Sequence, residues 1–303
     1  MTYDTMEYCF ESLNEKLDYT LNNTNLNDIF NTLSSIKGPT LVCGVGGSSV
    51  VAHFLAKVLR EKNKIIATFT FPRDLEYMSL QGYENVIAVS YSGNNIGVDE
   101  IYKTNLNKYL FTGNPKENTN NMVYTMPKEA SYVSIGATFI PLSILYLYYN
   151  NNLDIVKQVL DCNITTSSDN TQYEVLYGKE TSTAATLLES SIIEAGFGSC
   201  VLHEKYNYCH GRINVTRNCN SDLIMYRSDN ELDDLLYENL KKYYTNIITI
   251  DRKYDDEVTN DFYSSYISLR LIKAIATNKK TDISDMKELS DNDVLYLFKG
   301  KMK

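Results

Sequence analysis

Short apolar runs alternate with helix-like stripes over the first half of the chain. The runs of strand type, rich in β-branched and aromatic residues, are Thr40–Cys43, 65–71, 86–90, 108–112 and 122–126. Between them, at 50–60 and 98–106, apolar residues recur at steps of three and four residues, which is typical of amphipathic helices. Strands that alternate with helices at this spacing predict a doubly wound parallel sheet of the α/β class, in three αβα layers.

The same plan returns in the second half, after an Asn-rich break at 150–152. Strand-like runs are predicted at 173–177, 200–202, 222–226 and 246–251, with helices at 183–195 and 262–277. Before both halves, the apolar spacing in residues 1–37 predicts helices. We therefore expect N-terminal helices at 1–37, a first α/β domain at 38–150 and a second at 151–303.

The most apolar stretch, 132–149, contains Ser134, Thr138, Pro141 and Ser143. It falls short of the roughly 20 apolar residues that a membrane span requires. We expect a buried core helix there and no membrane association.

Two loops rich in Gly and Ser follow the first and third predicted strands, with the sequences GVGGSS at 44–49 and SYSGNN at 90–95. Glycines let the backbone turn sharply and approach a ligand. Serines at a helix start can face an anion together with unpaired backbone N–H groups. Because ligands of such sheets bind at the carboxyl ends of strands, the two loops predict one phosphate cradle. Its expected residues are Gly46, Gly47, Ser48, Ser49, Ser90, Tyr91, Ser92 and Asn95.

Taken alone, the first loop could also be an ordinary turn of an α/β protein or a dinucleotide-binding loop. The dinucleotide motif G-x-G-x-x-G is not matched, and no acidic residue closes a second strand about 20 residues later.

The composition narrows the class of protein further. The 303 residues carry a net charge of −9, which argues against a nucleic-acid partner. Six cysteines without a CxxC pair and only three histidines predict reduced thiols and no metal site. The polar, acidic start does not have the pattern of a signal peptide, so we expect a cytoplasmic protein. We also expect that it needs no cofactor.

The two loops resemble the marks of the sugar isomerase (SIS) domain, the phosphosugar-binding module of ketose–aldose isomerases. That family carries G-x-G-x-S after its first strand and S-x-S-G-x-T later. Here Asn95 stands where the family has Thr, and its amide can still donate to a phosphate. The resemblance extends from residue 38 to about 280 as a tandem SIS protein, and implies a sugar phosphate as ligand.

The second half departs from the phosphate-binding pattern. The sequence Ser228-Asp229-Asn230-Glu231 stands where the first half has Ser92-Gly93-Asn94-Asn95. Two acidic side chains there would repel a phosphate that carries about −1.5 to −2 charges. We therefore expect the first half to be the binding half.

Residues 194–212 resemble the catalytic stretch of two SIS branches, the isomerase half of glutamine–fructose-6-phosphate aminotransferase and the bifunctional phosphoglucose/phosphomannose isomerases. In both, a Glu precedes the catalytic His by sixteen residues, as Glu194 precedes His210 here. Arg212 replaces the Pro of the aminotransferase motif, and Asn207 replaces an acidic residue. The resemblance implies that Glu194 is the proton-transfer base, that His210 opens the sugar ring, and that a homodimer supplies this His from a neighbouring subunit.

Three nearby side chains are further candidates: Glu204 as a rival carboxylate, and Lys205 and Arg212 as ligand contacts. Structural roles are open for the acidic residues and for His210. Glu194 could be a helix-end surface charge, Glu204 a helix cap, and His210 the last helical residue before Gly211.

The leading interpretation is an aldose–ketose isomerase, or an isomerase-like deaminase, that acts on a hexose or aminohexose 6-phosphate. Such a reaction needs a base to move a proton between C1 and C2 and an acid/base group to open the ring. The alternative from another class is a non-catalytic phosphosugar sensor, which needs only the serines. A sugar-nucleotide or nucleoside-phosphate hydrolase is a third option.

Overall fold

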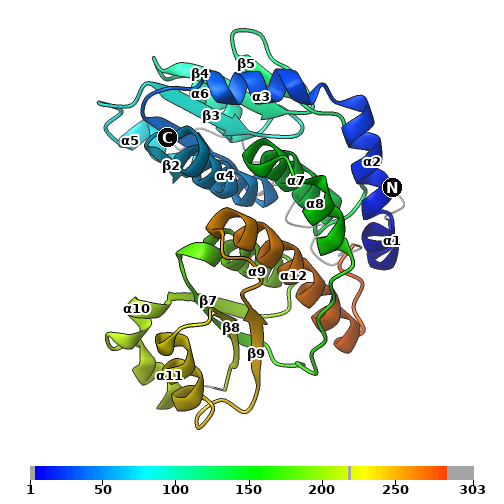
Figure 1. Ribbon diagram of the computed structural model, residues 1–303, viewed down its shortest axis with the longest axis vertical. Coiled ribbons are helices and arrows are strands. Elements are labelled where there is room, and N and C mark those ends of the chain that lie inside the picture. Colours follow the sequence, from blue (N-terminus) through cyan, green and yellow to red (C-terminus); the bar gives the residue numbers. More distant parts are fainter. Residues whose placement is uncertain (1–3, 218–219, 285–303) are drawn as a thin grey trace, which may run out of the picture. The chain divides into compact units, whose positions relative to one another are not determined.

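The computed structural model describes residues 4–217 and 220–284, and they form two compact units (Figure 1). The first unit runs up to Tyr148 and also takes in the segment that begins at Asp282; the second is Tyr149–Thr281. Each unit contains one parallel sheet with helices, so the predicted tandem of doubly wound α/β sheets is confirmed. The segment from Asp282 had been expected in the second domain.

The sheet of the first unit has the order β2-β1-β3-β4-β5, and every neighbouring pair is parallel. Its strands are β1 (Thr40–Cys43), β2 (Ala67–Thr70), β3 (Asn85–Val89), β4 (Asn107–Thr112) and β5 (Asn120–Val123). The chain leaves β1 toward one side of the sheet and returns to continue on the other side with β3. The order therefore reverses between β1 and β3, where ligands of such sheets bind.

Helices cover both faces of this sheet. They are α1 (Met6–Glu11), α2 (Leu13–Asn23), α3 (Leu26–Ser35), α4 (Gly47–Val58), α5 (Asp74–Tyr77), α6 (Ile96–Tyr102) and α7 (Gly136–Asn150), with a π-helical turn at Leu59–Asn63. Right-handed crossovers in opposite directions put α4 and α6 on opposite faces. Accordingly Leu41 and Cys43 of β1 pack with Val98 and Ile101 of α6, while α4 also contacts β1.

The predicted core helix is α7. Its residues from Thr138 to Tyr148 are buried, so it has no solvent face along this length. Among the helices in the described parts of the chain, none has both the length and the apolar character that crossing a bilayer demands.

The backbone N–H groups at the start of α7 are hydrogen-bonded by a carboxylate that also belongs to a buried ion pair. The Glu129 carboxylate accepts hydrogen bonds from the backbone N–H groups of Ile135 (2.8 Å) and Gly136 (2.9 Å). Lys16 of α2 reaches the same carboxylate, with 3.0 Å between its Nζ and Oε2 of Glu129, and both side chains are almost fully buried. The pair therefore joins the N-terminal helices to the core helix.

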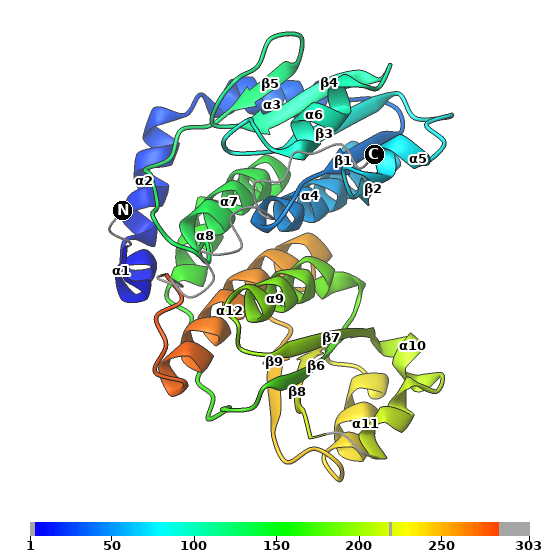
Figure 2. The ribbon, with the colours of Figure 1, turned by 180° about the vertical axis from the view of Figure 1, so that it is seen from behind.

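The sheet of the second unit has the order β7-β6-β8-β9, again all parallel. Its strands are β6 (Gln172–Tyr177), β7 (Ser199–Glu204), β8 (Asp222–Arg227) and β9 (Ile247–Asp251). Its helices are α8 (Leu153–Leu160), α9 (Ser182–Glu194), α10 (Lys205–Cys209), α11 (Glu231–Leu240) and α12 (Glu257–Asn278), with 3-10 turns at Lys179–Thr181 and Arg212–Arg217. Helices α9 and α12 pack together (Figure 2). Tyr208 of α10 and Leu236 of α11 belong to a separate hydrophobic cluster with residues of β6 and β8.

A polar network is buried within the second unit around Glu174 of β6. Ser221 and Tyr244 donate hydrogen bonds to its two carboxylate oxygens at 2.8 and 2.9 Å. Nε2 of His203 lies 3.4 Å from the Glu174 carboxylate. Burial raises the pKa of Glu174, but the hydrogen bonds from His203, Ser221 and Tyr244 outweigh it, so the pKa lies below its usual value.

We expect Lys16→Met to lower the free energy of unfolding by about 3 kcal/mol, because it leaves the Glu129 carboxylate buried without its countercharge. Lys64→Met is the matched control. Lys64 is exposed and lies 3.8 Å from Glu61, so its loss is expected to cost under about 1 kcal/mol. Urea denaturation of the two variants measures the difference, and equal unfolding free energies would show that the buried pair contributes nothing.

The Glu174 network predicts a pH dependence of stability. The pKa of Glu174 is lower in the folded chain than its usual value of 4.5. Its contribution to the free energy of unfolding is therefore complete above pH 4.5 and is lost as pH falls through the folded pKa. When the free energy of unfolding is measured with urea between about pH 5 and 3, it should fall less on acidification for Glu174→Gln than for the native chain. The exposed Glu11→Gln is the control, and parallel curves for Glu174→Gln and the native chain would contradict the assignment.

Candidate functional site

The first serine loop is a tight turn between β1 and α4. Gly46 has φ of +57° and precedes the first residue of α4. A Cβ on Gly44 would lie 2.4 Å from the carbonyl oxygen of Ser48, so the turn folds back on the helix as closely as only glycine allows. The Ser49 hydroxyl donates to the Gly46 carbonyl oxygen at 2.7 Å.

The second serine loop joins β3 to α6 and is held by Asn95. Oδ1 of Asn95 accepts the backbone N–H of Val98 at 3.2 Å and so caps α6. Its Nδ2 donates to the Val89 carbonyl oxygen at 3.3 Å. One amide hydrogen of Asn95 remains for a ligand, so this side chain chiefly shapes the loop.

The serine hydroxyls of the two loops differ in whether they already form hydrogen bonds within the described chain. Within the described chain, neither Ser48 Oγ nor Ser90 Oγ hydrogen-bonds to another residue, although Ser90 is buried. Ser92 Oγ accepts from the Asn94 N–H at 3.3 Å and keeps its own proton. Three of the predicted serines can therefore donate to an anion, whereas the proton of Ser49 is already used.

The hydroxyl proton of Tyr91 is already used within the protein and does not serve to bind an anion. It donates to the Met126 carbonyl oxygen at 3.0 Å, and its ring packs on Tyr124 with 5.5 Å between the ring centroids.

The parallel pairing of β1 with β3 brings the two loops together. Cys43 lies opposite Ala88 in the register, so both loops leave the same edge of the sheet. A Cβ on Gly97, in the first turn of α6, would lie 3.7 Å from Sγ of Cys43 at the end of β1. The positive end of the α4 dipole also faces this edge. The arrangement can receive an anion at the switch point of the sheet.

Two residues of this edge were not predicted. Asn114 and Lys116 follow β4 and reach across to the second serine loop. Asn114 Nδ2 donates to the Ser92 carbonyl oxygen at 3.2 Å, and Lys116 Nζ donates to Asn94 Oδ1 at 2.8 Å. The only signal for them in the sequence was a Gly-Asn-Pro turn at the end of a predicted strand.

The corresponding edge of the second unit is filled by its own side chains. Lys205 is buried there, and its Nζ lies 2.7 Å from Asp233 Oδ2 and 3.6 Å from Glu180 Oε1. Ser228 gives its backbone N–H to Asp233 and its hydroxyl to Glu180. Burial raises the pKa of Glu180, but its backbone hydrogen bond, Lys205 and Ser228 outweigh burial and lower it. Carboxylates of the chain thus occupy the donors that a phosphate would use.

Glu194 is the last residue of α9 and is partly buried. Burial raises the pKa of its carboxyl, while a 3.1 Å hydrogen bond from Ser190 lowers it to a lesser extent. A raised carboxyl pKa suits a group that must both take and return a proton near neutral pH.

His210 is exposed and ends α10, before Gly211 with φ of +111°. Glu204 caps the start of the same helix by accepting the N–H groups of Tyr206 (3.2 Å) and Asn207 (2.9 Å). Arg212 is exposed at the start of the 3-10 turn. The structural roles that the sequence left open for Glu204 and His210 are thus present in the geometry.

Glu194 and His210 lie at opposite edges of the second sheet. Helix α9 runs back from the carboxyl edge toward the start of β7, and α10 follows the end of β7 (Figure 2). Glu194, the last residue of α9, therefore precedes the amino end of β7, while His210 follows its carboxyl end. The six residues of β7 alone span roughly 16 Å. One copy of this unit therefore does not bring the two side chains together.

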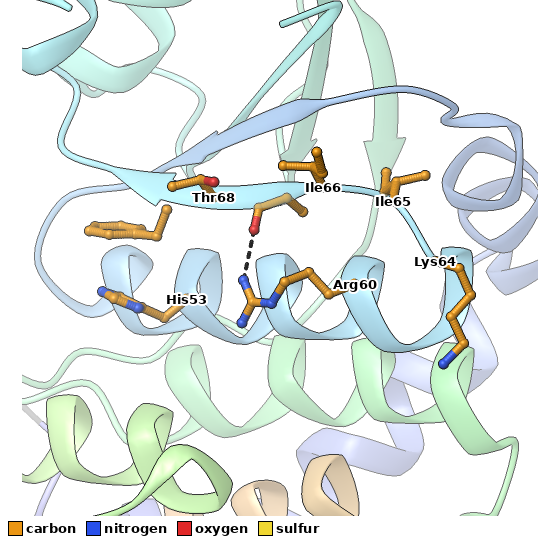
Figure 3. Close-up of a pocket in the computed structure, with 8 residues that line it drawn as sticks. His53, Arg60, Lys64, Ile65, Ile66 and Thr68 are labelled. Atoms are coloured by element: carbon orange, nitrogen blue, oxygen red, sulfur yellow. Dashed lines mark hydrogen bonds between the residues drawn. The ribbon is translucent and has the colours of Figure 1, made fainter. Parts of the chain in front are cut away.

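A separate shallow hollow of about 780 Å³ lies between α4 and the edge strand β2 (Figure 3). His53 stacks on Phe69 there with 3.8 Å between ring centroids, and Arg60 donates to the Ala67 carbonyl oxygen at 2.7 Å. None of the lining residues belongs to the serine loops. In the part of the chain that the structure describes, no group of three or more His, Cys, Asp or Glu side chains could hold a metal ion.

Comparison by sequence gives no match to a family model and none to a curated protein. Comparison of structures gives strong matches. A Clostridium difficile protein provisionally classed as a phosphosugar isomerase has a TM-score of 0.72 at 14% identity, with 99% of this chain and 100% of that chain covered. The C-terminal domain of glucosamine-fructose-6-phosphate aminotransferase from Francisella tularensis gives 0.69 at 12% identity, covering 92% and 97%.

Glucosamine-6-phosphate deaminase from Thermotoga maritima gives a TM-score of 0.65 at 13% identity, covering 91% of this chain and 96% of that chain. The likeness spans nearly the whole of each protein and includes both sheets. At these identities the likeness is evidence of the fold. It confirms the resemblance to the sugar isomerase domain that the two serine loops predicted. The chain has the fold of the tandem sugar isomerase domain proteins.

Proposed function

We propose that the first unit binds the phosphate of a sugar phosphate between its two serine loops. The observation that carries this proposal is the pair of uncommitted hydroxyls, Ser48 and Ser90, on adjacent loops at the switch point of the sheet. The names of the structural neighbours support the same ligand class, since they include a protein provisionally classed as a phosphosugar isomerase, an aminotransferase domain and a deaminase.

The proposed reaction is aldose–ketose isomerisation, or the related deamination, of a hexose or aminohexose 6-phosphate. Glu194 is the proposed base that moves a proton between C1 and C2, and its raised pKa supports that role. His210 is the proposed acid/base group that opens the ring, because imidazole is the side chain that most often transfers protons in general acid–base catalysis.

A homodimer follows from this assignment. Since Glu194 and His210 lie at opposite edges of one sheet, we propose that a site receives Glu194 from one copy and His210 from a second. The protein would work in the cytoplasm, where reduced thiols persist; the described cysteines, Cys9, Cys43, Cys162, Cys200 and Cys209, are all free.

A non-catalytic phosphosugar sensor is the second candidate. The observation that favours it is the capping role of Glu204 and the buried ion pairs of Lys205, which leave fewer second-half side chains for catalysis. A sensor needs only the serine loops of the first unit.

Exchange of a carbon-bound proton with solvent, at C1 of fructose 6-phosphate and at C2 of glucosamine 6-phosphate, tests the enzyme proposal. Fructose 6-phosphate and glucosamine 6-phosphate are incubated in heavy water with the native protein, with Glu194→Gln and with His210→Ala, and followed by NMR. We expect exchange with the native protein and at least a roughly 100-fold slower rate in both variants. Binding of either sugar phosphate without exchange would instead favour the sensor.

Mixing the two variants tests the shared site. In a dimer that exchanges subunits, half of the molecules pair one copy of each variant, and one of their two sites has both native groups. Glu194→Gln mixed with His210→Ala should therefore regain about a quarter of the native exchange rate. No recovery after complete subunit exchange, shown by native mass spectrometry, would mean that the two groups do not come from different copies.

A further inference from the structure

Lys116 lies across the second serine loop, from the loop between β4 and β5. Its Nζ donates to Oδ1 of Asn94 at 2.8 Å. A Cβ built on Gly93 would lie 3.0 Å from Cε of Lys116, so the lysine stem lies over a position where the loop has no side chain. The charged end therefore rests at the rim of the proposed phosphate cradle.

The backbone of Lys116 is clamped in place. Its N–H donates to Oδ1 of Asn121 at 2.9 Å, and its carbonyl oxygen accepts from Nδ2 of the same Asn121 at 2.7 Å. The hydroxyl of Tyr102 holds the next carbonyl, that of Glu117, at 2.6 Å. Lys116 is thus preorganised toward the loop, unlike a lysine on a freely moving surface segment.

Within the described residues, no carboxylate neutralises the charge of Lys116. Across residues 4–217 and 220–284 it forms no salt bridge, and its partner Asn94 offers only a neutral amide oxygen. An ammonium has three donors, so two remain after the bond to Asn94. In a chain of net charge −9, an ammonium that has no carboxylate partner among the described residues and lies against the second serine loop marks a place where an anion is favoured.

We propose that Lys116 binds the phosphate and selects phosphorylated sugars over neutral ones. On binding, its Nζ turns from Asn94 Oδ1 to a phosphate oxygen, which replaces a neutral acceptor with a charge-assisted hydrogen bond. The serine hydroxyls and loop amides fix the position of the phosphate, and Lys116 supplies the positive charge that they lack. This proposal rests on the proposed function, because it assigns a charge contact to the same cradle.

Calorimetric titration with fructose 6-phosphate at low and at physiological salt tests the assignment. Lys116→Met and Lys116→Gln should both raise Kd roughly tenfold at low salt and reduce its salt dependence, because both remove the charge. Lys116→Arg keeps the charge and should stay within about threefold of the native Kd. The control is Lys108→Met. Lys108 is the second residue of β4, the strand that precedes the Lys116 loop, and lies at the opposite edge of the sheet, so its loss should leave Kd unchanged.

The outcomes separate the two proposals. Native-like Kd and salt dependence in both Lys116→Met and Lys116→Gln, together with weakened binding in Ser90→Ala, would overturn the role of Lys116 and leave the serine cradle standing. If the native protein does not bind fructose 6-phosphate, glucosamine 6-phosphate or inorganic phosphate, both proposals fall. Melting temperatures of all variants check that each one is folded.

Discussion

Parallel pairing between β1 and β3 places the Gly44 turn beside the Ser90 loop, although the two are more than forty residues apart in the sequence. The crossovers leave these strands in opposite directions, and ligands of such sheets bind at the carboxyl ends of the strands where this reversal occurs. Gly44 and Gly46 then fold the first loop against the start of α4. The free hydroxyls of Ser48 and Ser90, and Lys116 at the rim, depend on this pairing for their positions.

The four strands of the second unit follow the same order as the first four of the first unit, but their carboxyl edge differs in chemistry. Its switch point holds Lys205 between Glu180 and Asp233, and Ser228 donates to both carboxylates. Buried ion pairs of this kind are costly to break by removal of one partner, so the edge is stable without a ligand. The two units thus share a topology but differ in chemistry: the first leaves donors open, and the second closes them with its own acids.

The sequence was sufficient for the sheets and for the serine loops. Thr40–Cys43 is a strand with the predicted bounds, because a β-branched run between Gly/Pro and Gly turns has few other solutions. Helices α8 and α11 were not predicted; α11 carries Glu231, Asp233 and Asp234 in its first turn, which weakens its apolar pattern. The separation of Glu194 and His210 follows from the predicted helix at 183–195 and strand at 200–202, because that strand lies between the two residues. For Lys116 the sequence offered only the neighbouring Gly-Asn-Pro turn, because the position of this lysine depends on Asn121, which clamps its backbone.

The most direct test of the account is to map backbone amide shifts by NMR while fructose 6-phosphate is added to the native protein. The account predicts that the largest shifts fall on residues 44–49 and 90–95, with Lys116 among the responders, and that the loops after β6 and β8 are unaffected. Shifts that instead concentrate at 178–181 and 228–230, or that fail to appear on the serine loops at saturating ligand, would contradict a phosphate site in the first unit.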